Sequence, residues 1–195
     1  MKTGITGGIG SGKSYVCTLL KQRGIRVYDC DTEAKRLMNS SDEIYRQLCR
    51  LIGPEVYQTD SDALATGRHA RTLNKAVMQQ FLLASDRNTQ AVNDIVHPVV
   101  ARDFQESGFD WMECAILYES GFERLVDKVI AVTAPIETRI ERIMQRNGIS
   151  REQAMEWIAK QWPQEEIARR ADFIIDNDGE KDLLPQIEEI LKTKH

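Results

Sequence analysis

The chain has no long apolar run and no excess of positive charge, and each absence excludes a class of protein. No stretch approaches the ~20 consecutive apolar residues that a membrane-spanning helix requires. The formal net charge is −4, so the chain lacks the basic excess that is typical of nucleic-acid-binding domains. We therefore expect neither a membrane nor a nucleic acid as a partner.

Cysteine is also scarce, which argues against a disulfide-stabilised secreted protein. The four cysteines stand singly, at Cys17, Cys30, Cys49 and Cys114, and no His, Cys or Asp spacing suggests a structural zinc site. Reduced and mostly packed thiols are the expectation, as in a cytoplasmic protein. The first expected strand begins directly at the N-terminus, which leaves no room for a signal peptide and agrees with that location.

What the chain does contain is the composition of an ordinary globular protein. Its 195 residues are 42% hydrophobic and 29% charged, enough for one substantial core. The length predicts a single domain over residues 1–195, with room for an inserted subdomain. For its assembly we expect a monomer or a weak homo-oligomer.

Residues 7–14 read Gly-Gly-Ile-Gly-Ser-Gly-Lys-Ser and match the G-x-x-x-x-G-K-S phosphate loop. The segment Lys2–Thr6 before them can form a strand, and the segment Tyr15–Leu20 after them can open a helix. The alternative is a glycine-rich turn without a chemical role. The strand–loop–helix context is the one in which the motif binds phosphate, and it favours the phosphate loop.

Each residue type in this loop has a physical role. The glycines let the backbone turn tightly, so that successive N–H groups point at an anion, and the helix N-terminus adds partial positive charge. Lys13 supplies a charge for the β- and γ-phosphates, and Ser14 offers a hydroxyl to Mg²⁺. The sequence therefore predicts binding of a nucleoside triphosphate with Mg²⁺.

Further apolar segments, separated by helical patterns, predict an α/β fold with a five-stranded parallel sheet flanked by helices. The expected strands besides the first are Ile25–Tyr28, Met112–Tyr118, Val129–Val132 and Phe173–Ile175.

No strand is expected between Asp31 and Gly108. Helical patterns cover Leu73–Leu83 and Thr89–Phe104, and Pro98 predicts a kink or a fresh helix start in the second. We interpret residues 31–108 as a helical acceptor-binding subdomain, inserted into a nucleotide-binding core of residues 1–30 and 109–195.

Polar residues follow the strand ends, where ligands of open α/β sheets bind. Asp29 and Asp31 follow the second strand and would point to opposite sides if the strand persists. An Asp near the transferring phosphoryl group can accept the proton of an attacking hydroxyl. The alternative is that both carboxylates cap the next helix. Placement opposite the phosphate loop favours Asp31 as the base.

Three arginines follow the fourth strand at positions i, i+3 and i+7, so they share one face of a helix: Arg139, Arg142 and Arg146. The segment Asn147–Ser150 interrupts this helix, and a second helix is expected over Arg151–Lys160. The pattern predicts a lid over residues 139–160 that binds phosphate oxygens.

The alternative for the arginine row is a solvated face paired with Glu137, Glu141 and Glu152. Because a phosphate loop is present, we favour the lid for Arg142 and Arg146, and Arg139 stays open.

Two other patterns carry less information. His97 precedes Pro98 inside a helical pattern, where a lone histidine more often packs or caps than catalyses. The segment Asn74–Val77 resembles a guanine-binding N-K-x-D motif but lacks its Asp. A signalling GTPase is therefore disfavoured, and a small-molecule kinase is preferred.

The chain resembles the dephospho-CoA kinase family in six blocks that occur in the family's order. The blocks are Thr6–Ser14, Val27–Asp31, Ile95–Pro98, Ala115–Glu119, the lid segment from Glu137 through Arg146 to Gln161, and Ala171–Gly179. The phosphate loop is shared widely, but the other blocks are specific to the family. Tyr15, Cys30 and Ala115 depart from the family pattern, and the segment Thr59–Arg71 fits it poorly.

The resemblance implies that ATP phosphorylates the ribose 3′-hydroxyl of dephospho-CoA to give coenzyme A and ADP. It implies catalytic roles for Asp31, Lys13 and Arg142, with Mg²⁺ held at Ser14. The implied ATP-binding residues are Gly8, Ile9, Gly10, Ser11, Gly12, Lys13, Ser14, Tyr15, Arg142, Arg146, Asn177 and Gly179. The implied acceptor-side residues are Thr6, Asp31, His97 and Glu119.

Two other functions remain as alternatives. One is a different nucleoside or nucleotide kinase, which would phosphorylate another acceptor. The other is a nucleotide-dependent binding switch, which would bind and slowly hydrolyse ATP without responding to any acceptor.

Overall fold

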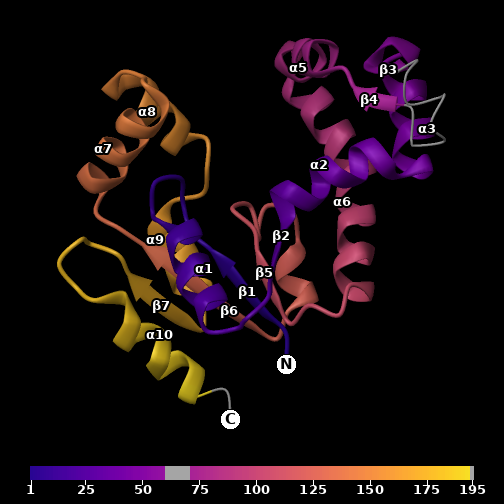
Figure 1. Ribbon diagram of the computed structural model, residues 1–195. Coiled ribbons are helices and arrows are strands. Elements are labelled where there is room, and N and C mark those ends of the chain that lie inside the picture. Colours follow the sequence, from indigo (N-terminus) through magenta and orange to yellow (C-terminus); the bar gives the residue numbers. More distant parts are fainter. Residues whose placement is uncertain (60–70, 194–195) are drawn as a thin grey trace. The chain divides into compact units, whose positions relative to one another are not determined.

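The computed structural model describes residues 1–59 and 71–193, and the chain divides into two compact units. One unit joins Met1–Asp29 to Gly108–His195, and the other is Cys30–Ser107 (Figure 1). The segment Thr59–Arg71, which fits the family pattern poorly, lies mostly outside the described residues.

The first unit is built on a five-stranded parallel sheet with the strand order β2-β5-β1-β6-β7. Its strands are β1 (Thr3–Thr6), β2 (Val27–Asp29), β5 (Trp111–Glu113), β6 (Lys128–Thr133) and β7 (Phe173–Asp176). Its helices are α1 (Lys13–Gln22), η2 (Phe122–Leu125), α7 (Ile136–Asn147), α8 (Arg151–Ala159), α9 (Gln164–Arg170) and α10 (Leu183–Lys192). The predicted α/β class is confirmed.

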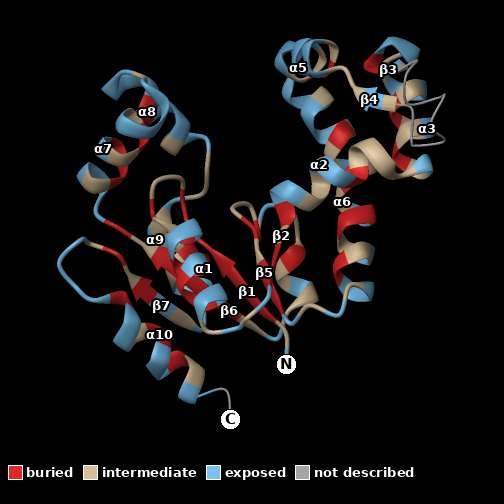
Figure 2. Ribbon diagram, in the orientation of Figure 1, coloured by how far each residue is buried: buried red, intermediate tan, exposed pale blue. Residues whose placement is uncertain are grey.

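One face of this sheet forms a continuous apolar core with α1 and α10, and Figure 2 shows the strands largely in the colour of buried residues. Val16 and Leu20 of α1 meet Ile130 of β6, Ile175 of β7 and Ile187 of α10 in this core. Because side chains alternate along a strand, Ile130 and its neighbour in sequence face opposite sides of the sheet. Strand β1 and helix α1, which flank the phosphate loop, both contribute side chains to this core.

A left-handed glycine, Gly24, follows the end of helix α1. Gly24 has φ +78 and donates its N–H to the carbonyl of Lys21, and Ile25 donates to Leu20. This left-handed turn caps the helix and returns the chain to β2.

The third expected strand, Met112–Tyr118, is shorter than predicted. Strand β5 ends at Glu113, and the following apolar residues run through turns, with Cys114 and Leu117 buried. A short apolar run indicates burial but does not separate a strand from a buried turn. Glu113 therefore lies at the end of a strand rather than within one.

The second unit is mainly helical, and the long helix α6 packs against the other three helices. Its helical elements are α2 (Cys30–Ser40), α3 (Asp42–Leu51), η1 (Pro54–Val56), α5 (Lys75–Ala84) and α6 (Asp86–Glu106). The prediction for Pro98 of a fresh helix start is wrong, because α6 continues through this residue as one helix.

The expectation that this region contains no strand is also wrong. Two short strands, β3 (Tyr57–Thr59) and β4 (Arg71–Leu73), pair antiparallel, with Tyr57 opposite Leu73. Three residues are too few to show an alternating pattern. Leu73 therefore belongs to β4, and α5 begins after Asn74, whose side chain accepts the N–H of Val77.

The cysteines of the described chain are free, and three of them are buried. Burial raises the pKa of the Cys17 thiol to about 12, so this residue stays protonated and packs as an apolar side chain.

Helices α7 and α8 form a pair that packs around its own small core (Figure 1). Gly148 ends α7 in the left-handed conformation, and Ser150 and Gln153 form a capping box at the start of α8. Ile140 and Ile143 of α7 are buried with Ala154 of α8. The helix break expected at Asn147–Ser150 is present.

Candidate functional site

The phosphate loop joins β1 to α1, and its glycines are surrounded at very short range. A Cβ on Gly12 would lie 2.0 Å from Nδ2 of Asn177, and one on Gly8 would lie 2.3 Å from Nη2 of Arg139. Gly12 also has φ +94, which side-chain-bearing residues rarely adopt. Close packing therefore disfavours a side chain at both positions, and at Gly12 the left-handed turn disfavours it as well.

The lysine of the motif is buried at the start of α1. Its Nζ donates to the carbonyl of Gly7 at 2.7 Å. The hydroxyls of Thr6 and Ser11 are buried in the same region and have no hydrogen-bond partner within the described chain. Because buried polar atoms are normally paired, these hydroxyls and the lysine fit a site built for a polar ligand.

Arg139 belongs to this site, although its role was open in the sequence. It is only 4% exposed, and its Nε donates to the carbonyl of Ile9 at 2.9 Å. Burial lowers the pKa of Arg139 below its ordinary value. The arginine row is therefore not a solvated face at this position, and a guanidinium covers Gly8.

Arg142, one turn further along α7, also reaches the loop. Its Nη1 lies 3.4 Å from the carbonyl of Gly10, and its Nη2 donates to the carbonyl of Asn177 at 3.2 Å. Asn177 follows β7 and donates from Nδ2 to the carbonyl of Ser11 at 2.8 Å. The structure thus brings Arg142 and Asn177 together on the phosphate loop.

The remaining nucleotide-side residues of the prediction are exposed. Ser14 and Tyr15 lie in the first turn of α1, and Tyr15 is 58% exposed. Arg146 is on the last turn of α7, where its Nε donates to Oδ1 of Asn147 at 3.0 Å. Gly179 lies in the turn after β7 with φ +96.

Glu137, one of the glutamates that a solvated arginine row would pair with, has another partner in the structure. Glu137 binds both Nη atoms of Arg151 at 2.7 Å, so its partner comes from α8 and not from the row on α7. The hydrogen bonds to Arg151 lower the pKa of Glu137.

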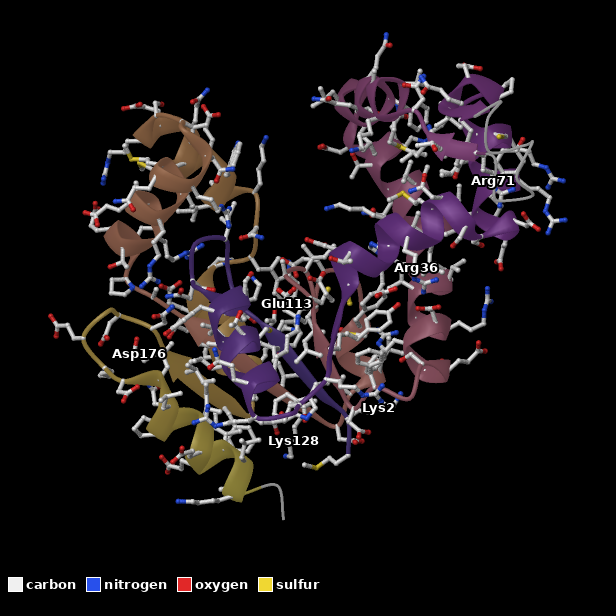
Figure 3. All side chains as sticks on the ribbon, viewed as in Figure 1. Lys2, Arg36, Arg71, Glu113, Lys128 and Asp176 are labelled. Carbon is white, nitrogen blue, oxygen red and sulfur yellow. The ribbon has the colours of Figure 1, made fainter. Side chains whose placement is uncertain are left out.

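Glu113 is a residue of this site that the sequence argument missed. It is the last residue of β5 and lies in register with Asp29, the last residue of β2. Figure 3 shows Glu113 at the end of the sheet opposite Lys128, the first residue of β6. Strand β5 pairs with β1, which leads into the phosphate loop, so two carboxylates end the strands on one side of the loop. Ending this strand at Glu113 in the sequence would have placed Glu113 among the polar residues at the strand ends.

The second strand does not persist through Asp31, so the expected alternation of Asp29 and Asp31 is wrong. Strand β2 ends at Asp29 and α2 begins at Cys30, so the two side chains do not alternate along one strand. Asp31 is exposed in the first helical turn, where a carboxylate interacts favourably with the helix dipole.

The acceptor-side residues of the prediction fall in both units. Asp31 and His97 belong to Cys30–Ser107, and Thr6 and Glu119 belong to the other unit. His97 is half-buried on α6, and burial lowers its pKa, opposed by the charge of Asp94. Glu119 is exposed, and its Oε1 accepts the N–H of Trp162 at 3.4 Å.

Within residues 1–59 and 71–193, no three His, Cys, Asp or Glu side chains gather as a metal cluster. Over the same residues, no helix combines the length and the apolar character needed to cross a membrane.

Comparisons with known proteins identify the family of this chain. The family model of dephospho-CoA kinase matches residues 1–182. A dephospho-CoA kinase of Bacteroides fragilis is 41% identical over 202 residues, which cover 98% of this chain and 91% of the relative. The crystal structure of TT1252 from Thermus thermophilus has a TM-score of 0.80 and 30% identity, covering 100% of this chain and 97% of that one.

More distant structures share the fold. The dephospho-CoA kinase from Campylobacter jejuni has a TM-score of 0.64 at 21% identity, covering 100% of this chain and 96% of that one. A shikimate kinase from Acinetobacter baumannii has a TM-score of 0.54 at 12% identity, covering 99% of this chain and 92% of that one. Both support a kinase fold built around the phosphate loop. Since the family model spans both units of the structure, the chain belongs to the dephospho-CoA kinase family.

Proposed function

We propose that this protein transfers the γ-phosphoryl group of ATP to the ribose 3′-hydroxyl of dephospho-CoA, giving coenzyme A and ADP. The observation that carries the proposal is the family match over residues 1–182, because it includes the unit Cys30–Ser107 as well as the phosphate loop. A phosphate loop alone indicates only that a nucleotide binds.

The nucleotide side of the reaction rests on positive charge around the loop. Lys13, whose Nζ donates to the carbonyl of Gly7, is proposed to neutralise the β- and γ-phosphates, and Arg142 lies on the loop with a planar guanidinium that suits phosphate oxygens. Such positioned charges lower the barrier because they stabilise charge that develops on the transferring group. Arg146, exposed on the same helix, is proposed as a second phosphate contact that is made when the nucleotide is bound.

Mg²⁺ is proposed as the companion of ATP, and the donors near the loop fit it. Ser14 offers an exposed hydroxyl, and Asp29 and Glu113 offer carboxylates at neighbouring strand ends. Mg²⁺ prefers hard oxygen ligands and is commonly held by one or two carboxylates together with substrate phosphates. When bound, the ion neutralises phosphate charge.

The acceptor is proposed to bind through the unit Cys30–Ser107, with Asp31 as the group that orients the ribose hydroxyl and accepts its proton. Asp31 follows the end of β2 by two residues, and it lies in a block that matches the family pattern. His97, Thr6 and Glu119 are proposed as further acceptor-side residues on the strength of the family blocks that contain them.

We propose that residues 139–160 act as a lid that closes when ATP and dephospho-CoA are both bound. The arginines on α7 and the left-handed Gly148 between the two helices support this role. Amide hydrogen exchange across 139–160 should slow on saturation with both ligands, and unchanged exchange would contradict the lid.

We further propose that the protein works in the cytoplasm as a monomer or weak homo-oligomer, without membrane or nucleic-acid partners. The free thiols and the net charge of −4 support this setting.

The experiment that tests the proposed function measures ADP release from ATP with a panel of acceptors. Dephospho-CoA, adenosine, AMP and pantetheine are compared at equal concentrations. The proposal requires turnover with dephospho-CoA well above that with the other acceptors. Preference for adenosine or AMP would indicate a nucleoside or nucleotide kinase, and slow ADP release that no acceptor changes would indicate a binding switch.

A further inference from the structure

Ile9, in the middle of the phosphate loop, is held by both ends of the lid. Its N–H donates to Oε1 of Gln161 at 2.7 Å, and its carbonyl accepts from Nε of Arg139 at 2.9 Å. Arg139 lies near the start of α7, and Gln161 follows the end of α8. The N–H and the carbonyl of Ile9 are therefore bound by side chains at the two ends of the lid.

The side chain of Ile9 is held by the same region. It packs against the buried cluster of Ile140, Ile143 and Ala154, which forms the core between α7 and α8. Ile9 therefore belongs by its side chain to the core of the lid and by its backbone to the phosphate loop. A shift of either element displaces the other, because packed side chains have few alternative arrangements.

Gln161 is itself fixed by its neighbours in sequence. The ring of Trp162 stacks on Tyr118 with ring centroids 6.0 Å apart, and the guanidinium of Arg170 lies 4.7 Å from the centroid of the Trp162 ring. The N–H of Trp162 donates to Glu119, and the N–H of Gln161 donates to the carbonyl of Ile158. Such stacking restricts the chain at the exit of α8, so the backbone from which the Gln161 side chain reaches the loop is held in place.

We propose that Gln161 is a positioning residue that sets the backbone of the phosphate loop for ATP, with Ile9 as the point that couples the lid to the loop. This inference rests on the proposed function, in which the loop binds ATP. Because Gln161 accepts the N–H of Ile9, this backbone donor is already occupied in the structure. The phosphates are left to the other N–H groups of the loop and to Lys13. Without Gln161 the peptide can turn, and the loop loses its single conformation.

The chain offers a matched control in Gln164, three residues further on. Its side chain also binds a backbone peptide, accepting from the N–H and donating to the carbonyl of Ala134, both at 3.1 Å. Ala134 follows β6 and is not part of the phosphate loop. Gln164→Leu removes the same kind of hydrogen bond as Gln161→Leu and leaves the contact with Ile9 in place.

The test compares these two variants by ATP affinity without acceptor, KM for dephospho-CoA, kcat and Tm. Gln161→Leu is expected to weaken ATP binding by about tenfold, because ATP must then order a loop that is no longer held in one conformation, and about 1.4 kcal/mol of ordering corresponds to a factor of ten. Its KM for dephospho-CoA should stay within twofold of the parent. Gln164→Leu should keep the parent's ATP affinity even if its Tm falls as far. Equal ATP affinity in the parent and in Gln161→Leu would overturn the proposal, and so would equal losses in both variants.

A second measurement covers the case in which Gln161→Leu does not fold. NMR-detected exchange of the Ile9 amide in the parent protein, without nucleotide, should be slow because Gln161 accepts that proton. Fast exchange there would overturn the proposal. A parent that binds ATP but does not phosphorylate dephospho-CoA would refute the proposed function and leave this inference to be judged by ATP affinity alone.

Discussion

Replacing Gly12 with alanine should damage the nucleotide site far more than the same change at Gly24. Both glycines are left-handed, with φ +94 and φ +78, so alanine pays about 1 kcal/mol or more of backbone strain at either position. At Gly24 nothing lies within 4 Å of the added Cβ, so the strain is the whole effect. For a chain of this length, that cost lowers Tm by about 2–4 °C.

At Gly12 the added carbon would lie 2.0 Å from Nδ2 of Asn177, so Asn177 must move. Asn177 is 8% exposed, and its movement breaks the 2.8 Å hydrogen bond to Ser11 and disturbs the contact with Arg142. A lost hydrogen bond adds about 1 kcal/mol and an unpaired buried group about 1–3 kcal/mol, so the excess over Gly24→Ala is about 2–4 kcal/mol and the total loss, strain included, is about 3–5 kcal/mol. ATP affinity should fall by about tenfold or more, since 1.4 kcal/mol corresponds to a factor of ten.

The assay combines urea unfolding with binding of a fluorescent ATP analogue for Gly12→Ala, Gly24→Ala and both changes in an Asn177→Ala background. Removing the Asn177 side chain removes the clash, so the excess cost of Gly12→Ala over Gly24→Ala should disappear there. Equal effects of the two glycine replacements, or an excess that persists in the Asn177→Ala background, would refute the reasoning.

Three further predictions concern single side chains. Lys13→Ala should lower kcat by about 10²–10³-fold in a protein that remains folded by circular dichroism, because a positioned charge on the phosphates is lost; near-normal turnover would contradict the site. Asp31→Asn should lower kcat by about 10²–10⁴-fold with little change in KM for ATP, and Asp29→Asn should lower kcat less. A larger loss of kcat in Asp29→Asn than in Asp31→Asn would assign the role of base to Asp29. Burial lowers the pKa of His97, so the unfolded chain binds more protons than the folded protein as pH falls through 6.5. The free energy of unfolding should therefore drop more between pH 8 and pH 5.5 in the parent than in His97→Gln. An equal drop in both proteins would refute the lowered pKa of His97.

Most strands that lead to the site were predictable from an apolar run followed by polar residues, but β5 was predicted too long because buried apolar residues continue past Glu113. The parallel arrangement and the strand–loop–helix unit follow from these runs and from the phosphate-loop motif. The strand order, with β1 between β5 and β6, does not follow from a linear pattern, because pairing is decided by long-range packing. The register that sets Glu113 beside Asp29 was hidden for the same reason.

The arginine row shows what spacing can and cannot predict. Positions i and i+3 on one helix place Arg139 and Arg142 on a common face, and both reach the loop. That Arg139 is buried over Gly8 depends on the close approach of α7 to the loop, which the sequence does not encode locally. Gln161 entered the sequence analysis only as the end of the lid block of the family resemblance, because a glutamine after a helix is ordinarily solvated and does not indicate a contact with the loop.

The most direct test of the central claim is the chemical identity of the product made from ATP and dephospho-CoA. Phosphorus NMR of the quenched reaction should show a new phosphomonoester coupled to the ribose 3′ proton, formed in a one-to-one ratio with ADP. The proposed function predicts this product, and predicts that Lys13→Ala forms it about 10²–10³-fold more slowly. ADP accompanied only by inorganic phosphate, or a phosphomonoester at another position, would contradict it.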